Sequence, residues 1–186
     1  MASAPPSTPR QLRLSLWQDP AYLKSDFVGG PSNSLATATL ATWPRWHGGC
    51  LTLVGPEGVG KTHLAQIWAQ EAGAVRLDRL SPDLPAARAG PVVLEDVDQG
   101  VDDEALFHLI NLAAREGGGL LLTARTAPTA WPAALPDLRS RLNALPVAEI
   151  EAPDDLVLEA VLKQLFRQLS IRPPNDVYPY LLRRMP

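Results

Sequence analysis

Eight consecutive residues carry the clearest chemical pattern in this chain. The run Gly55-Pro56-Glu57-Gly58-Val59-Gly60-Lys61-Thr62 consists of a glycine, four residues and then Gly-Lys-Thr. Glycines at this spacing let successive backbone N–H groups turn inward around an anion, and the N-terminus of a following helix adds partial positive charge. In such a loop Lys61 reaches the terminal phosphates of a nucleotide, and the Thr62 hydroxyl binds Mg²⁺. The run therefore predicts a site for a nucleoside di- or triphosphate.

The segments on either side of this run fit a phosphate loop. The apolar residues Cys50–Val54 predict a strand that leads into it, and the pattern from Leu64 to about Ala72 predicts a helix that leads out. A strand before the loop and a helix after it are the context that the motif requires. The alternative is a chance glycine turn, which the match at every fixed position disfavours. We include His63, which follows the loop, among the predicted nucleotide-binding residues.

A second group of polar residues follows two predicted strands. Glu95 and Asp96 close the apolar run that starts at Pro91, and Thr123 ends the run that starts at Leu120. In phosphate-loop proteins one carboxylate holds Mg²⁺ and the next polarises a water aimed at the γ-phosphate, which are the roles predicted for Glu95 and Asp96 respectively. Paired acids also begin ordinary loops, so the upstream phosphate loop carries this prediction. Thr123 is a candidate sensor of the γ-phosphate, or an ordinary strand-ending threonine.

Strands and helices alternate along the rest of the chain. Further strands are predicted at 74–77, 91–96, 120–123 and 146–150, with helices at about 32–42, 102–116 and 137–142 and others starting near 153 and 175. The segment 82–90 is a short crossover rich in proline and alanine, with little room for a helix. This alternation predicts an α/β fold with a parallel sheet, helices on both faces, and the ligand at the carboxyl ends of the strands.

Composition limits the functions that fit. With 186 residues, of which 46% are hydrophobic, the chain can bury one full core and at most a small second one. Its apolar runs are too short to span a membrane, it lacks a secretory signal pattern, and a lone Cys50 fits a reducing cytoplasm. A net charge of −3 without a dense basic cluster gives no general attraction to nucleic acid. The three histidines have no metal-ligand spacing, and the five tryptophans are predicted to be packing residues.

The segment from Tyr22 to Asn33 resembles the stretch that opens the nucleotide domain of the bacterial replication initiator DnaA. The similarity covers nearly the whole chain after residue 20 and extends through the phosphate loop, Leu94-Glu95-Asp96, Leu122-Thr123 and Arg139-Ser140-Arg141-Leu142. The chain thus resembles an AAA+ P-loop domain of the DnaA class, followed by the start of a helical lid. This resemblance implies that Phe27 and Val28 line the adenine pocket. It also implies that Arg141 is an arginine finger acting on a neighbouring subunit's nucleotide, although the residue alone favours an ordinary exposed arginine.

A short peptide near the N-terminus indicates a protein-binding partner. The sequence Gln11-Leu12-Arg13-Leu14-Ser15-Leu16 resembles the peptide by which bacterial proteins dock on the DNA polymerase sliding clamp. Gln11 would hydrogen-bond at the rim of the clamp pocket, while Leu14 and Leu16, with Leu12, provide the apolar contacts of a short extended peptide. A strand packed on the domain is the alternative. We predict a flexible tail with this peptide at 1–20, an AAA+ domain at 21–151 and a partial lid at 152–186.

A clamp-tethered, DnaA-like AAA+ protein resembles the Hda/HdaA family of regulatory inactivators of DnaA. The resemblance implies ADP or ATP with Mg²⁺ as ligands. It implies the clamp, DnaA and a second copy of the chain as partners, and stimulation of ATP hydrolysis by DnaA as the activity. Glu95 occupies the position at which the family's Mg²⁺ ligand is commonly aspartate. The ATPase activity of this chain is therefore expected to be weak at most. Sequence-specific DNA binding is not expected, because the crossover between Leu77 and Pro91 has no room for the helices with which initiators grip DNA and no helix-turn-helix domain follows.

Three other functions stay open at this point. A helicase loader or clamp-loader-like ATPase shares the same motifs. A small-molecule kinase also uses a phosphate loop, but the acidic strand end and the absence of an arginine-rich lid disfavour it. A scaffold with a vestigial nucleotide site is the third. The second sensor arginine of the AAA+ family is expected beyond Pro186, since Arg183 and Arg184 fall in the preceding helix.

Overall fold

The computed structural model describes residues 22–174 and 176–184, so the clamp-like peptide at 11–16 lies outside the described residues. Five strands form one parallel sheet in the order β2-β3-β4-β1-β5. Their bounds are Cys50–Val54 for β1, Val75–Leu77 for β2, Val92–Leu94 for β3, Leu120–Ala124 for β4 and Val147–Glu149 for β5. This arrangement confirms the predicted α/β fold. The phosphate-loop strand β1 lies between β4 and β5.

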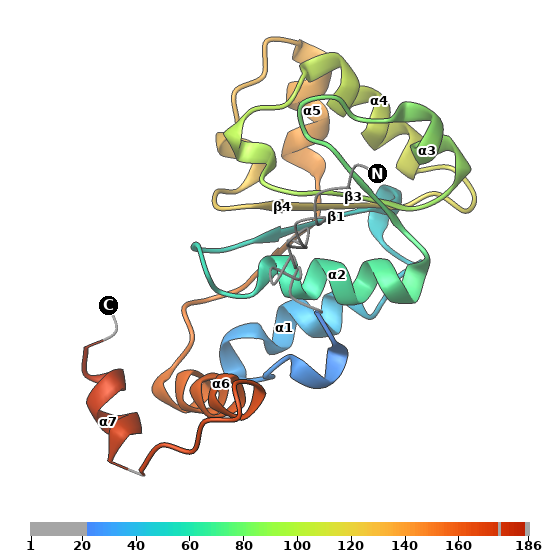
Figure 1. The fold of residues 1–186 in the computed structure, drawn as a ribbon. Helices are drawn as coiled ribbons and strands as arrows, with labels where there is room; N and C mark the ends of the chain where they lie inside the picture. The colour runs from blue at the N-terminus through green and yellow to red at the C-terminus, as the bar shows by residue number, and fades with distance from the viewer. Residues whose placement is uncertain (1–21, 175, 185–186) are drawn as a thin grey trace, which may run out of the picture.

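Helices cover both faces of the sheet (Figure 1). The α-helices are α1 Pro31–Leu40, α2 Lys61–Ala72, α3 Leu84–Ala89, α4 Asp103–Ala113, α5 Pro136–Ala144, α6 Asp155–Gln168 and α7 Val177–Leu182. Short 3-10 turns lie at Lys24–Asp26, His47–Gly49, Val97–Gln99 and Pro128–Ala130. Helices α1 and α2 lie on one face and α3, α4 and α5 on the other, while α6 and α7 extend beyond α1.

Strand residues alternate between two apolar cores, as a period of two requires. In β4, Leu120 and Leu122 pack with α4 and α5, whereas Leu121 packs with α1 and α2. In β1, Leu51 and Leu53 face the same side as Leu121. All of these side chains are buried, as is normal for a parallel sheet covered on both faces. The tight core fixes the carboxyl ends of β1, β3 and β4 relative to one another, and the phosphate loop follows β1 at this edge.

Two local predictions are wrong. The crossover 82–90 contains the six-residue helix α3, whose N-cap Asp83 accepts a hydrogen bond from Ala86 N at 3.2 Å. A cap and a proline in the first turn suffice for this short helix, which is too short to show a periodic pattern. Strand β3 ends at Leu94, so Glu95 and Asp96 follow the strand instead of closing it. Both acids still leave the sheet at its carboxyl edge.

The tryptophans largely behave as predicted. Trp46 and Trp68 stack with ring centroids 4.9 Å apart in the core beside α2, and Trp131 is buried beneath α4 and α5. Trp17 lies outside the described residues. Within residues 22–174 and 176–184, the structure contains no helix with the length and apolar character that a membrane crossing requires.

Candidate nucleotide site

Glycines shape the loop between β1 and α2. Gly58 and Gly60 have φ values of +80° and +99°, in the left-handed region that side chains disfavour. A Cβ atom on Gly55 would lie 2.3 Å from the Ile150 carbonyl oxygen, so only glycine lets the chain leave β1 this close to the end of β5. The loop therefore curls back over the sheet edge before Lys61 begins α2. The predicted strand, loop and helix are all confirmed as local structure.

Lys61 lies across this loop. Its Nζ donates hydrogen bonds to the carbonyl oxygens of Gly55 and Pro56, each at 2.7 Å. The side chain is nearly buried, and burial lowers the pKa of Lys61, an effect that the nearby Asp96 carboxylate opposes. A cation that is largely removed from water and bonded only to two neutral carbonyls gains from an anionic partner. The lysine is thus positioned to bind phosphate.

The Thr62 hydroxyl and the Glu95 carboxylate, both predicted as Mg²⁺ ligands, are hydrogen-bonded to each other. Thr62 Oγ1 donates to Glu95 Oε2 at 2.6 Å, and Glu95 is buried. The second carboxylate oxygen, Oε1, accepts from Gln66 Nε2 at 3.2 Å and pairs with Arg76 Nε at 3.3 Å. A hydroxyl and one carboxylate oxygen are the hard donors with which proteins hold Mg²⁺ beside a polyphosphate. The pair fits that ion, whereas Gln66 and Arg76 hold the other oxygen in place.

Asp96, unlike Glu95, lines the pocket that Lys61 and Thr62 also line. Its φ of +53° turns the chain sharply after β3, and the Asp96 side chain lines a pocket with Lys61 and Thr62. The Asp96 backbone N donates to Thr123 Oγ1 at 3.1 Å, which ties the end of β3 to β4. Thr123 itself is buried and does not line the pocket. In this structure its hydroxyl positions the turn that carries Asp96.

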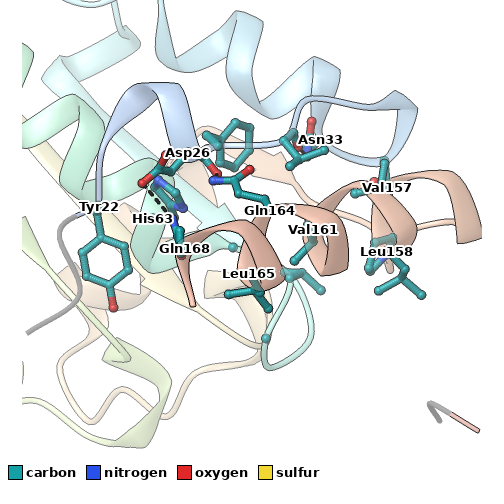
Figure 2. A pocket seen from close by; sticks show the side chains of 17 residues that line it. Tyr22, Asp26, Asn33, His63, Val157, Leu158, Val161, Gln164, Leu165 and Gln168 are labelled. Carbon is teal, nitrogen blue, oxygen red and sulfur yellow. Dashed lines mark hydrogen bonds between the residues drawn. The ribbon is translucent and has the colours of Figure 1, made fainter. Parts of the chain in front are cut away.

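A second cavity of about 310 Å³ adjoins the loop on the side of α1 and α6 (Figure 2). Its wall includes the predicted Phe27 and Val28, the loop residues Gly58–Gly60, and apolar side chains of α6. A Cβ atom added to Gly60 would lie 3.5 Å from the Phe27 ring, an ordinary van der Waals contact, so the ring lies beside the loop. An apolar cavity with a few polar groups at its wall fits a nucleoside base and sugar.

His63 belongs to the walls of both hollows. Together with Tyr22, Gly58 and Gly60 it lines both the apolar cavity and the phosphate pocket. Its Nε2 lies 2.9 Å from the Leu23 carbonyl oxygen, and its ring packs edge-on against Phe27 at 5.4 Å between centroids. The ring thus joins α2 to the segment before α1. A nucleotide could extend from the cavity past His63 to Lys61.

Helix α6 contributes much of the cavity wall, which the sequence did not indicate. The apolar side chains of Val157, Leu158, Val161 and Leu165 line this cavity, and Leu169 is exposed. Gln164 Nε2 donates to the Asp26 carbonyl oxygen at 2.7 Å, and Gln168 Nε2 to its carboxylate at 3.0 Å (Figure 2). These bonds hold α6 over the cavity. The wall residues that sequence reasoning missed are completed by Tyr22, Asp26, Ser32, Asn33 and Pro153.

Arg141 lies away from this site. It occupies the last turn of α5, which leads to the amino end of β5, whereas the phosphate loop follows the carboxyl end of β1. Its positive charge opposes the effect of burial, which raises the pKa of the Cys50 thiol at the start of β1 to about 12. The length of β1, roughly 13 Å at about 3.3 Å per residue, thus separates Arg141 from the loop of its own chain. The Arg141 side chain is exposed and forms no hydrogen bond or ion pair with another described residue.

Arg125 is a further residue at the phosphate pocket that the sequence did not single out. It follows β4 directly and lines the pocket with Glu57, Lys61 and Asp96. Its Nη2 pairs with Glu57 Oε2 at 2.9 Å. Among the described residues, no cluster of three or more His, Cys, Asp or Glu side chains could hold a metal ion.

Comparisons with known proteins agree with this geometry. The chain is 29% identical to the chromosomal replication initiator protein DnaA of Rippkaea orientalis, over 95% of this chain and 45% of that protein. Domain III of DnaA from Thermotoga maritima superposes with a TM-score of 0.70 at 22% identity, covering 88% of this chain and 81% of that one. AMPPCP-bound DnaA from Aquifex aeolicus gives a TM-score of 0.70 at 20% identity, covering 87% and 60%. No protein-family model matches the chain.

The similarity covers one part of these relatives. The chain spans about half the length of the curated DnaA proteins that it matches. The part that corresponds holds the five-stranded parallel sheet with its flanking helices. This chain is therefore similar in sequence to part of DnaA and shares the fold of DnaA domain III.

Proposed function

We propose that this chain is a nucleotide-binding regulator of replication initiation that docks on the sliding clamp and stimulates ATP hydrolysis by DnaA. The observation that carries the nucleotide part is that the apolar cavity and the phosphate pocket share Tyr22, Gly58, Gly60 and His63 in their walls. The base and sugar would occupy the cavity between Phe27 and α6, and the phosphates would lie on the loop amides and Lys61. Titration with ADP and ATP tests this part directly.

The bound metal has a defined place in this proposal. Thr62 Oγ1 and Glu95 Oε2 would hold Mg²⁺, which neutralises phosphate charge when bound. Arg76 and Gln66 keep the other carboxylate oxygen of Glu95 engaged, so that carboxylate is fixed before nucleotide arrives. Phosphate charge is also met by the amino end of α2, which the loop leads into. These groups would bind and orient the nucleotide, and this role does not require ATP hydrolysis by the chain.

Docking on the clamp is the second part of the proposal, and it rests on the sequence of residues 11–16. Replacing Gln11 with alanine should weaken clamp binding by roughly tenfold or more, because polar groups of the clamp pocket would lose their partner. Surface plasmon resonance with immobilised clamp measures this change. Gln18→Ala, in the same tail but outside the peptide, is the matched control, and ADP affinity should be equal in both variants. Unchanged clamp affinity of the Gln11 variant would refute the anchor.

The regulatory part is tested by DnaA itself. Hydrolysis of ATP by DnaA is measured with and without DNA-loaded clamp, before and after this protein is added. Stimulation that depends on both the clamp and this chain supports the proposal. If DnaA hydrolyses ATP at the same rate throughout, this chain does not act on DnaA, whatever nucleotide it binds.

An ATP-hydrolysing loader is the second candidate, and the position of Asp96 favours it. The carboxylate lines the phosphate pocket beside Lys61 and Thr62, where a base could polarise an attacking water. For this candidate, the purified chain should turn over ATP steadily, and Asp96→Ala should reduce the rate by roughly 100-fold or more. For the regulator, we expect little turnover by the chain alone. A phosphate-release assay on the wild type and the Asp96 variant distinguishes the two.

A further inference from the structure

Strand β5 forms one edge of the sheet, and among the described residues it pairs with β1 alone. On its inner side, the Pro146 carbonyl oxygen and the Ile150 N–H bond to β1 at 2.9 Å and 2.7 Å. Backbone polar groups of successive strand residues point to alternate sides, so the N–H and C=O groups of Val147 and Glu149 point away from β1. An open edge of this kind is a template for a further strand.

The two faces of β5 differ in polarity. Ala148 and Ile150 are buried in the core that includes α1. Val147, which is 45% exposed, and Glu149 lie on the opposite face, as a period of two requires. Helix α1 contacts β5 on the buried face and carries Leu35, which is 70% exposed. A strand added here would need apolar side chains on the α1 side and polar ones on the other.

The peptide at 11–16, which lies outside the described residues, has this alternation. Its three leucines alternate with polar residues, and Arg13 lies among the polar set. With the leucines on the α1 side, Arg13 shares a face with Glu149, and opposite charges on neighbouring strands attract. The other edge strand, β2, carries the exposed cation of Arg76, which would repel Arg13. Charge therefore favours β5.

The start of the described chain sets the direction of such a strand. Tyr22 lines the phosphate pocket, and the end of β5 lies beside the same loop, since a Cβ atom on Gly55 would be 2.3 Å from the Ile150 carbonyl oxygen. Residues 17–21 can span up to about 17 Å when extended. The last residue of the peptide would thus lie near the carboxyl end of β5 and its first residue near the amino end. The peptide would run parallel to β5, like every other pair in this sheet.

The hand of the connection also favours β5. From the outer side of β5 the chain would cross to β1 through α1, which lies on the same face of the sheet as α2 (Figure 1). The connection from β1 to β2 through α2 moves across the sheet in the same direction, so both connections would have the same hand. Parallel crossovers share one hand in about 98% of cases. Addition to β2 would give the opposite hand.

We propose that residues 11–16 pair with the outer side of β5 as a further parallel strand, which hides the clamp-binding peptide until the clamp competes for it. This inference rests on the clamp docking in the proposed function. The two bound states exclude each other, because both use the backbone and the leucines of the same six residues. The apparent affinity for the clamp is then reduced by the fraction of molecules in which the peptide is free.

Hydrogen exchange of single amides, followed by NMR on the full chain, tests the pairing. The outward N–H groups of Val147 and Glu149 should exchange about tenfold more slowly in the wild type than in Leu14→Asp, whose charge cannot lie on the apolar face. Saturating clamp should speed their exchange in the wild type in the same way. The Ile150 amide is the internal control, because it bonds to β1 whether or not the peptide is present.

Clamp affinity, measured by surface plasmon resonance with immobilised clamp, tests the competition. Val147→Pro removes an outward N–H without affecting the bonds to β1, and Glu149→Lys places a like charge beside Arg13. Each should tighten clamp binding by up to about tenfold, because the peptide is freed. Glu116→Lys makes the same charge change at an exposed acid before β4 and should leave the affinity unchanged. Thermal unfolding confirms that each variant is folded.

The outcomes separate this inference from the proposed function. If the wild type and the β5 variants do not bind the clamp, the docking part of the proposed function fails, while amide exchange still reports whether the peptide pairs with β5. Exchange at Val147 and Glu149 that Leu14→Asp changes by less than twofold would overturn the pairing. Protection that persists in saturating clamp would overturn the competition. Protection that grows with protein concentration would mean that a second copy supplies the strand, which contradicts pairing within one chain.

Discussion

Replacement of Lys61 by alanine should abolish ADP binding at micromolar nucleotide, raising the Kd by about 100-fold or more. Among the residues that the structure describes, the ammonium group bonds only the carbonyl oxygens of Gly55 and Pro56, and burial has already removed most of its water. Transfer of this charge to phosphate oxygens forms charge-assisted hydrogen bonds, each contributing about 1.5–3 kcal/mol. Two such bonds are enough to account for the expected loss.

Calorimetry with ADP and with adenosine measures this effect. Adenosine has no phosphates and would bind only in the cavity between Phe27 and α6, so Lys61→Ala should leave its weak affinity unchanged. Lys163→Ala is the matched control, since that lysine pairs with Glu159 on α6 and does not line the phosphate pocket. ADP affinity within threefold of the wild type in a folded Lys61 variant would contradict the assignment of the loop.

The phosphate loop could be predicted because its geometry is local. The positive φ of Gly58 and Gly60, the bonds of Lys61 to Gly55 and Pro56, and the start of α2 all arise within eight residues. The parallel sheet was also predictable, because continuous apolar runs are typical of strands buried on both faces. Short elements without a period, such as α3, were beyond this reasoning.

The apolar cavity could not be derived from the residues alone. The resemblance to DnaA pointed to Phe27 and Val28, but the opposite wall comes from α6, whose Gln164 contacts Asp26 across 138 residues of sequence. Helical periodicity can indicate which face of a helix turns inward. It could not show that space remains beneath Val161 and Leu165, because that depends on how far α6 stands from the loop.

Residue type also failed to reveal two charged contacts. Glu95 was predicted as a metal ligand, but its bonds to Gln66 and Arg76 were not. These bonds depend on how α2 packs against β3 and on the register of β2 with β3. Arg125 follows a strand end and looks like a surface arginine in the sequence. Only the pairing of β4 with β1 brings it beside the loop and Glu57. Such contacts are set by tertiary packing, on which local patterns carry no information.

The two arginines on α5, Arg139 and Arg141, lie in different environments, and their replacement is expected to have different effects. Arg139 is partly buried and donates to the carbonyl oxygens of Thr129, at 3.2 Å, and Trp131, so it fastens α5 to the preceding loop. Arg141, two residues later, is exposed and bonds no described residue. It stands a strand length from the phosphate loop of its own chain. Arg141 is therefore free to meet a nucleotide on another molecule, which under our proposal is the ATP of DnaA.

Arg141→Ala should fold, bind ADP and the clamp, and yet fail to stimulate DnaA. Arginine fingers contribute roughly 10³- to 10⁵-fold to kcat by stabilising charge on the transferring phosphoryl group, so the stimulated rate should fall to the unstimulated one. The readout is DnaA-dependent ATP hydrolysis on DNA-loaded clamp. Arg141→Lys should recover only part of the stimulation, because an ammonium group cannot bridge two phosphate oxygens as a guanidinium does.

Two further variants are controls. The Arg115→Ala variant, altered at another exposed arginine, should stimulate normally, whereas Arg139→Ala should lower the thermal stability. Full stimulation by the Arg141 alanine variant would exclude the arginine finger, because that role requires the guanidinium group of Arg141.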